Sequence, residues 1–357
     1  MHRSLAGYLA HVESGYIRMV EWDELVLFNY TDQCTFDRRW DEFTLKARGI
    51  IYCRHSGDVV AHPFGKFFNY EEHEGLYGRE AVQALLRGPH YVQEKMDGSL
   101  GIIYWWKGQW RVATRGSFSS DQALRATEIL KKYDLSGLPT DCTCLAEIIY
   151  PENRIIVPYG EEEKLVLLAV RHRGGHYYTH DDVERFAAAA KMPVVAKREI
   201  SVEKALELKK SLPYTEEGWV VVCEDGTRLK IKGDDYMRIA KFKANLAPLA
   251  VWEALSLGSY QEMAVASPEE CRAELGAIYA KLSADFGALL ARVEREIELI
   301  GQAVGWDNPV RKTIALEVQR RPPWMHGPLF SRLTSKEVNH GLLWKLLRPT
   351  GNVYVNP

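Results

Sequence analysis

Short apolar segments bounded by turn residues fill the first two thirds of the chain. They are rich in β-branched and aromatic side chains, which is typical of strands. The segments are residues 48–52, 59–61, 100–106, 110–114, 145–149, 165–170 and 219–222. Apolar positions at helical spacing predict helices between some of these strands. Those helices cover residues 121–133, 181–191 and 202–212.

The pattern changes near residue 243, where strand signals nearly vanish. Helical spacing then predicts one or two helices over residues 268–300 and further helices over 306–320 and 335–347. Residues 320–328, RRPPWMHGP, predict a loop because they hold three prolines. We therefore expect an α+β fold with two domains. Residues 1–243 form antiparallel sheets with flanking helices, and residues 244–357 form an all-helical domain.

Residues 91–104, YVQEKMDGSLGIIY, combine charged side chains with apolar flanks. Tyr91 and Val92 predict one strand and residues 100–106 the next, with Asp97-Gly98 as the turn between them. Lys95 then stands at a strand end, where a partly desolvated lysine can lose its proton and attack an electrophile. The same pattern also fits a surface hairpin with a solvated lysine.

Carboxylates and lysines recur at other strand positions. Glu147 interrupts an apolar strand, which is costly unless the carboxylate is paired or binds a cation. Glu217 stands just before a very apolar strand. Lys230 and Lys232 are two residues apart, so on a strand they point to one face, although such a pair is more often a solvated edge. Lys66 lies among phenylalanines, where it either covers the core or holds a phosphate near a stacking base.

Composition narrows the classes of protein. Lys and Arg number 46 against 48 Asp and Glu, so a nucleic-acid partner would need a local basic patch. No apolar run is long enough for a membrane span, and the N-terminus lacks a secretory pattern, so we expect a cytoplasmic protein. Cys142 and Cys144 have strand spacing rather than zinc-site spacing. The six cysteines are therefore expected to be reduced and buried.

Eight short motifs follow one another along the chain. They are Arg48-Gly49-Ile50, Phe64-Gly65-Lys66-Phe67-Phe68-Asn69, Lys95-Met96-Asp97-Gly98-Ser99, Arg115-Gly116-Ser117, Glu147-Ile148-Ile149, Pro151-Glu152-Asn153-Arg154-Ile155, Glu217-Gly218-Trp219-Val220 and Lys230-Ile231-Lys232. In this order they resemble the motifs of covalent nucleotidyltransferases, which include nucleic-acid ligases and messenger-RNA capping enzymes. The resemblance covers residues 48–236 and is greatest to the RNA ligase 1 family of phages, because of the phenylalanine-rich segment and the Pro-Glu-Asn-Arg loop.

The resemblance implies an ATP-dependent RNA ligase with a nucleotidyltransferase domain in residues 1–243. Lys95 would attack the α-phosphorus of ATP to form lysyl–AMP, and AMP would pass to an RNA 5′-phosphate. A 3′-hydroxyl would then displace AMP and seal the strand. The implied partner is single-stranded or nicked RNA, and the implied cofactors are ATP and Mg²⁺, with Mn²⁺ as an alternative.

The resemblance also assigns roles to site residues. Lys95 is the nucleophile, and Glu147 and Glu217 would hold hydrated magnesium or the ribose. Lys232, with Lys230 as its partner, would contact the α-phosphate. The other nucleotide-binding candidates are Arg48, Lys66, Phe68, Glu94, Gly98, Arg115 and Tyr236. Several relatives carry lysine at the position of Arg115. The resemblance therefore does not fix which ligand group Arg115 contacts.

Two other readings remain. A DNA ligase or a capping-type guanylyltransferase usually carries an oligonucleotide-binding barrel after the last lysine motif, whereas residues after Tyr236 predict helices. A catalytically inactive nucleic-acid-binding relative would lack the lysine or a carboxylate, and none is missing. The sequence does not set the oligomeric state, and we assume a monomer. It assigns no role to residues 244–357.

Overall fold

The structure is a computed structural model, and it describes the chain apart from residues 1–2, 245, 306–309, 336 and 350–357. The chain divides into two compact units, Met1–Met237 and Arg238–Pro357. Helix α9 (Asp234–Ala244) contains this division, and the cut that we predict from the sequence lies in the same helix. Each unit is described separately below.

The first sheet of unit 1 is built near the N-terminus. Its strand order is β1-β2-β3-β4, and neighbouring strands are antiparallel. Tyr8 of the first helix stacks on Phe28 of the sheet at 5.0 Å between ring centroids. The predicted hairpin between residues 48–52 and 59–61 is present. The elements are α1 (Arg3–Glu13), β1 (Ile17–Trp22), β2 (Leu25–Tyr30), α2 (Asp32–Phe36), α3 (Glu42–Lys46), β3 (Arg48–Cys53) and β4 (Val59–Ala61).

The second sheet has the order β10-β9-β7-β8 and is antiparallel throughout. Helices α6 and α7 cover it through a core that includes Ile129, Ile148 and Val183. The Pro-Glu-Asn-Arg segment, which follows β9, begins with a short 3-10 helix (Pro151–Asn153). The other elements are β7 (Ser99–Trp106), β8 (Gln109–Thr114), α6 (Asp121–Leu130), β9 (Cys142–Ile149), β10 (Lys164–His172) and α7 (His180–Ala190).

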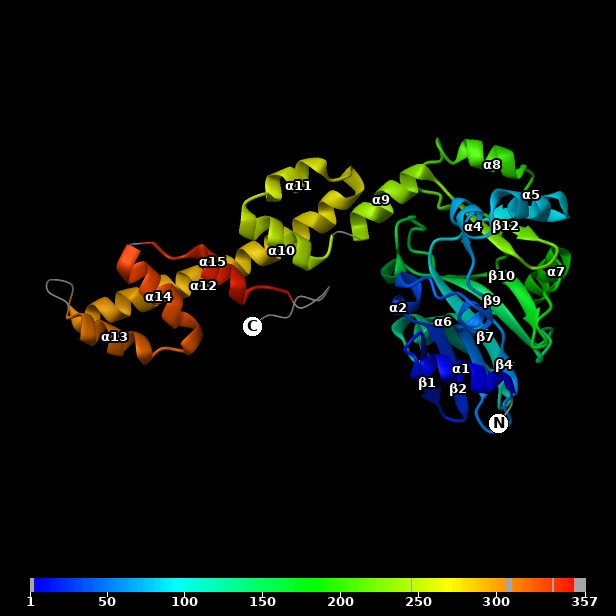
Figure 1. Ribbon diagram of the computed structural model, residues 1–357, viewed down its shortest axis with the longest axis horizontal. Helices are drawn as coiled ribbons and strands as arrows, with labels where there is room; N and C mark the ends of the chain where they lie inside the picture. The colour runs from blue at the N-terminus through cyan, green and yellow to red at the C-terminus, as the bar shows by residue number, and fades with distance from the viewer. Residues whose placement is uncertain (1–2, 245, 306–309, 336, 350–357) are drawn as a thin grey trace. The chain divides into compact units, whose positions relative to one another are not determined.

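The third sheet has the order β11-β6-β12-β13-β5. Only the short β5 is parallel to its neighbour. Helices α4, α5 and α8 cover one face of this sheet, where Val82, Val221 and Ile231 are buried (Figure 1). The elements are β5 (Phe68–Asn69), α4 (Tyr70–Tyr77), α5 (Arg79–Arg87), β6 (His90–Glu94), β11 (Lys197–Arg198), α8 (Val202–Leu208), β12 (Gly218–Cys223) and β13 (Arg228–Lys232).

The segment between β6 and β7 differs from the prediction. The two strands do not pair: β6 pairs with β11 and β12, whereas β7 pairs with β8 and β9. Asp97-Gly98 is therefore not the turn of a hairpin, and the surface-hairpin reading is wrong. Residues 95–98 cross from the third sheet to the second, which places Lys95 between two sheets.

The described part of unit 2 consists of helices joined by short connections, with no strand. Helix α12 is a single 33-residue helix where we predicted one or two. The loop predicted over residues 320–328 is confirmed for 320–322 and wrong for 323–328, because α14 begins at Pro323, where a missing N–H costs little. Residue 306, the predicted start of the preceding helix, lies outside the described residues. The helices are α9, α10 (Pro248–Leu257), α11 (Tyr260–Ala266), α12 (Arg272–Val304), α13 (Arg311–Gln319), α14 (Pro323–Ser335) and α15 (His340–Leu346).

The α+β fold with antiparallel sheets is thus confirmed, as are the six cysteines, which are free and buried. None of the described helices has the length and apolar character needed to cross a lipid bilayer.

Candidate active site

Lys95 lies where the chain leaves the third sheet. Its backbone N–H donates to the carbonyl oxygen of Gly218 at 2.9 Å, which extends the pairing of β6 with β12 by one residue. The side chain is mostly buried, with 19% of its surface exposed. The position at a strand end is the one that the sequence predicts, and the surrounding walls come from two sheets rather than from one hairpin.

Glu217 joins two lysines. One carboxylate oxygen accepts from Lys95 Nζ at 2.7 Å, and the other lies 2.8 Å from Lys232 Nζ. Only 3% of the Glu217 side chain is exposed. A buried carboxylate is stable when close opposite charges and hydrogen bonds compensate its desolvation. The ends of β6 and β13 and the residue before β12 therefore form a compact Lys–Glu–Lys cluster.

Glu147 is buried in β9 without such compensation. Its carboxylate accepts one hydrogen bond, from the Gly98 N–H at 2.9 Å, and it forms no ion pair with any described residue. Burial raises the pKa of Glu147 to about 7, while the Lys95 charge acts in the opposite direction. A bound cation would stabilise the ionised form, so Glu147 fits a metal-binding role.

Gly98 is required by the crossing itself. A Cβ atom there would lie 2.6 Å from the Ile148 carbonyl oxygen and 3.1 Å from Glu147 Cγ. The segment that carries Lys95 therefore lies against β9, which brings Glu147 next to the nucleophile candidate. We predicted this glycine for close approach to a ribose, and the structure gives it a second function in packing.

Asp97 holds the crossing segment, and the sequence did not single it out as a site residue. Its buried carboxylate accepts from the backbone N–H groups of Ile156 and Val157, both at 2.8 Å, and from the Tyr236 hydroxyl at 2.7 Å. Burial raises the pKa of Tyr236. The tyrosine is therefore a neutral donor, and its ring lies 5.1 Å from Lys232 Nζ.

Lys230 shares the Lys232 face of β13, as the spacing predicts, while Leu229 and Ile231 are buried on the other face. Burial, together with the charges of four neighbouring cations, lowers the pKa of Lys230 to about 7. Its Nζ lies 5.3 Å from the centre of the Phe67 ring. A phosphate would favour its charged form.

Arg48 lies on the same aromatic ring. Its guanidinium carbon is 5.5 Å from the Phe67 ring centre, and burial lowers the pKa of the side chain. Its Nη1 is buried without a hydrogen-bond partner. An unsatisfied buried guanidinium N–H is costly, and an anion would satisfy it.

Lys66 is enclosed by aromatic rings. Its Nζ lies 5.5 Å from the ring centre of Tyr30, 5.2 Å from that of Trp40 and 5.2 Å from that of Phe68. Arg115 lies over the Tyr30 ring at 5.3 Å and donates to its hydroxyl at 3.1 Å. Tyr30 and Trp40 were missed as site residues, because isolated aromatic residues in the sequence are more often core.

Five of the six charged candidates named below lie together, and Glu94 lies apart from them. Lys95, Glu147, Glu217, Lys230 and Lys232 lie in one electrostatically linked cluster. Glu94 instead forms an ion pair with Arg198 of β11, so no described contact joins it to this cluster.

A family model described as RNA ligase matches residues 46–246, which is more than half of the chain. The chain belongs to the RNA ligase family. The match contains all the motifs that we used for the resemblance, from Arg48 to Lys232.

Individual relatives agree with the family. RNA ligase 1 of bacteriophage TS2126 is 36% identical over 143 residues, 36% of this chain and 35% of the relative. The RNA ligase of Rhodothermus phage RM378 is 24% identical over 293 residues, 63% of this chain and 66% of the relative. Four curated relatives are covered over only 34% to 66% of their own lengths. An archaeal ATP-dependent RNA ligase structure has a TM-score of 0.48 and 15% identity, covering 88% of this chain and 85% of that one.

Proposed function

We propose that this member of the RNA ligase family is an ATP-dependent ligase that joins 5′-phosphate and 3′-hydroxyl ends of single-stranded or nicked RNA. The observation that carries the proposal is the Lys95–Glu217–Lys232 cluster, with ion-pair distances of 2.7 and 2.8 Å. It combines a nucleophile candidate, a buried carboxylate and a cation for a phosphate. Residues 1–243 would supply the nucleotidyl-transfer chemistry.

In the first step, neutral Lys95 attacks the α-phosphorus of ATP. A phosphorus–nitrogen bond forms and the bond to pyrophosphate breaks. The nitrogen, which is positively charged after the attack, then gives one proton to water. In the free protein the Lys95 amino group donates a hydrogen bond to Glu217. This hydrogen bond must break before the amino group can attack. Lys230 and Lys232 would offset charge on the α-phosphate as it becomes pentavalent.

The later steps reuse the same groups. The 5′-phosphate oxygen of RNA attacks the lysyl–AMP phosphorus and frees Lys95. The 3′-hydroxyl then attacks the activated 5′-phosphate and releases AMP. Arg48 and Lys66 have charges suited to the ATP phosphates or the RNA 5′-phosphate, and both lie on aromatic rings that could pack against a base.

Magnesium fits Glu147, a buried carboxylate, and Glu217 would join Glu147 as a ligand once Lys95 has left. Glu147 has no ion pair among the described residues, and carboxylate oxygens with retained water are what Mg²⁺ prefers. No group of three or more His, Cys, Asp or Glu side chains suited to a metal occurs in the described part of the chain. Glu147 and Glu217 would therefore hold the ion together with water and phosphate oxygens. Bound Mg²⁺, or Mn²⁺, would supply charge neutralisation of the phosphates.

Two observations bear on the competing functions and on location. The described elements after β13 are helices, whereas a DNA ligase or a capping enzyme usually carries a barrel there. Six free cysteines support a cytoplasmic location, where thiols stay reduced.

The test compares nucleotides and ends. The protein is incubated with labelled ATP or GTP and magnesium, then with RNA or DNA strands that carry 5′-phosphate and 3′-hydroxyl ends. We expect ATP-dependent joining of RNA. Joining of DNA alone, or a covalent adduct with GTP and not with ATP, would contradict the proposal.

A further inference from the structure

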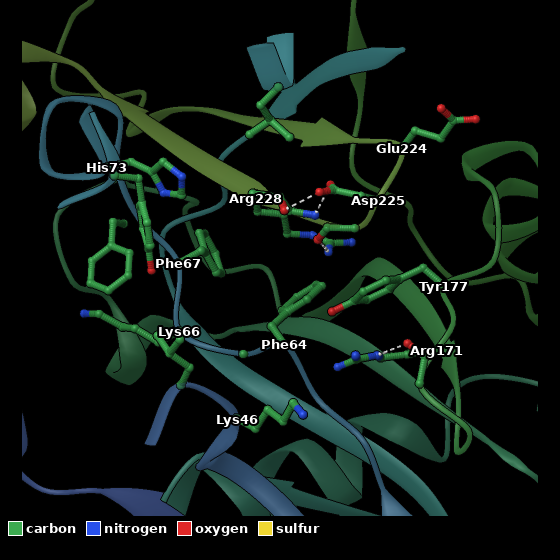
Figure 2. A pocket seen from close by; sticks show the side chains of 18 of the residues that line it. Lys46, Phe64, Lys66, Phe67, His73, Arg171, Tyr177, Glu224, Asp225 and Arg228 are labelled. Atoms are coloured by element: carbon green, nitrogen blue, oxygen red, sulfur yellow. Dashed lines mark hydrogen bonds between the residues drawn. The ribbon is translucent and has the colours of Figure 1, made fainter. Parts of the chain in front are cut away.

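A cavity of about 720 Å³ lies in unit 1 at the opposite end of β13 from Lys232. Arg228, the first residue of β13, lines it together with Phe64, Arg171 and Tyr177 (Figure 2). Lys95, Glu147 and Glu217 do not line it. Of its lining residues, the function proposed above uses Lys66 and Phe68 and leaves Arg171, Tyr177 and Arg228 without a role.

Two arginines meet on one aromatic ring in this cavity. The Arg228 guanidinium lies 4.0 Å from the Tyr177 ring centre and 4.5 Å from that of Phe64. Arg171 lies 4.5 Å from the Tyr177 ring centre, and Tyr177 lies between the two guanidinium groups in the view of Figure 2. Arg228 is 5% exposed. Burial lowers the pKa of Arg171, and the charge of Arg228 acts in the same direction.

These charges have no carboxylate partner. Neither arginine forms an ion pair with any residue that the structure describes. Arg171 donates to the carbonyl oxygens of Pro63 at 2.6 Å and Gly175 at 2.8 Å, and Arg228 Nη1 donates to that of Gly226 at 2.8 Å. Arg228 Nε is buried with no hydrogen-bond partner. Two like charges held together in this way would be stabilised by an anion.

The walls and size of the cavity suit a nucleotide. Volumes of about 300–1,000 Å³ are typical of small-ligand sites. Phe64, Phe67 and Tyr177 supply aromatic surface of the kind on which bases stack, and Lys66 adds a further cation. Glu224 and Asp225 also line the cavity, but both are exposed, so the buried part is cationic.

Phe67 connects the cavity to the candidate active site. Its ring lines the cavity and also carries Arg48 and Lys230, at 5.5 and 5.3 Å. A strand bound in the cavity could therefore continue towards the phosphate-binding lysines.

We propose that this cavity binds a phosphate and its adjoining nucleotide from single-stranded RNA, at a subsite separate from that of the reacting α-phosphate. Arg171 and Arg228 bind the phosphate, and Tyr177 and Phe64 hold the base or the guanidinium groups in place. The choice of RNA as the strand rests on the proposed function. The anion site itself rests on the two unpaired arginines.

The first test measures binding of a labelled oligoribonucleotide of about eight nucleotides to the full chain, without ATP, over a range of salt. We expect Arg228→Gln to weaken binding about 10-fold and to lower the slope of log K against log salt by about 0.7, which corresponds to one lost phosphate contact. Arg173→Gln is the matched control. Arg173 also donates to backbone carbonyls, those of Trp105 and Thr140, but it does not line the cavity.

A second variant changes affinity in the opposite direction. Glu224 is exposed and lines the cavity, so Glu224→Gln removes a repulsive charge without disturbing the core. We expect RNA binding to tighten about twofold at low salt. A gain in affinity cannot come from misfolding, which keeps the proposal testable if Arg228→Gln is unstable. An unchanged affinity in Glu224→Gln, or in folded Arg228→Gln, overturns it.

Competitors identify the source of the phosphate. Inorganic phosphate and AMP are added to the RNA complex, and we expect neither to displace the strand at the concentration at which unlabelled RNA does. Displacement by either at that concentration would assign the cavity to a small anion instead. Parallel loss of RNA binding and lysyl–AMP formation in Arg228→Gln would place the cavity in the nucleotide site. A protein that binds RNA through this cavity and forms no lysyl–AMP would refute the proposed function and not the subsite.

Discussion

The two ends of strand β13 hold positive charge in different ways. At one end, Lys232 is ion-paired with Glu217, which also binds Lys95. At the other end, Arg228 lies on aromatic rings and forms no ion pair with a described residue. A buried carboxylate fixes the positions of both lysines and neutralises part of their charge. Aromatic support fixes a guanidinium and leaves its charge available to an anion.

The largest expected effect concerns the ion-paired end. Lys95→Ala should abolish lysyl–AMP formation, because no other group replaces the nucleophile. It should partly spare the sealing of RNA that already carries 5′-AMP, since that step needs no lysine nucleophile. Gel assays with labelled ATP and with pre-adenylylated RNA measure the two activities.

Lys95→Arg separates chemistry from structure. It keeps a positive charge next to Glu217, and it should still form no adduct. If either variant forms a covalent AMP adduct, the nucleophile is another residue. The ion-paired end of β13 would then not be the end that holds the nucleophile.

A smaller loss is expected at the carboxylate. Glu217→Gln keeps the shape of the side chain but removes the charge that holds Lys95 and Lys232, so lysyl–AMP formation should slow about 100- to 1,000-fold. Glu163→Gln is the control, because Glu163 also lies near two cations, Arg125 and Lys132, but outside the site. Near-normal rates in Glu217→Gln across a range of magnesium would make this carboxylate structural.

Glu147 predicts a pH effect. Its pKa rises from 4.5 to about 7 on folding, so the folded protein holds a proton that the unfolded chain has lost. This group therefore lowers stability progressively as pH rises from about 4.5 to about 7, and no further above that. Glu147→Gln should remove this contribution, which urea unfolding at pH 5 and pH 8 can measure. An identical pH dependence in both proteins would show that Glu147 does not titrate in this range.

Lys230 lies between the two ends of β13. We expect its replacement to raise thermal stability and to slow lysyl–AMP formation. Its pKa falls from 10.5 to about 7 on folding, so its charge destabilises the fold fully below about pH 7 and progressively less towards pH 10.5. At pH 7, Lys230→Met should raise Tm by about 2–4 °C, the effect of roughly 1 kcal/mol in a domain of this size. Lysyl–AMP formation should slow about 10-fold, the effect of roughly 1.4 kcal/mol. A lower Tm would show that the charge stabilises the fold.

The smallest effect on lysyl–AMP formation is expected from truncation after Ala244, which keeps helix α9 whole. Every residue that we assign to this step lies before the cut, so the adduct should form at the full-length rate. Joining of structured RNA should fall, if unit 2 positions the ends. Circular dichroism checks folding, and a folded truncation without lysyl–AMP would place unit 2 in the nucleotide site.

At the ion-paired end of β13, the order of apolar and polar residues predicted where the lysines lie. The alternation in residues 229–232 gave the common face of Lys230 and Lys232, and the apolar flanks placed Lys95 at a strand end. It did not predict the pairing of Lys95 and Lys232 with Glu217. That pairing depends on β6 meeting β12 across more than a hundred residues of chain, and nothing near Asp97-Gly98 distinguishes a crossover from a hairpin turn.

The other end could not be predicted from the sequence. Arg171 and Arg228 belong to different sheets, and neither lies in a motif. Only the fold brings both to Tyr177, and only the structure shows that they lack carboxylate partners among the described residues. Helix α14 was missed for a local reason, because its prolines read as a loop although one of them opens the helix.

The role of Lys95 as the nucleophile is tested most directly by locating the covalently bound nucleotide. The full chain is incubated with labelled ATP and magnesium, denatured and digested, and the labelled peptide is identified by mass spectrometry. We predict one AMP per chain on Lys95, bound through an acid-labile phosphorus–nitrogen bond and released by pyrophosphate. AMP on another residue, or no adduct from a folded protein, would contradict this role.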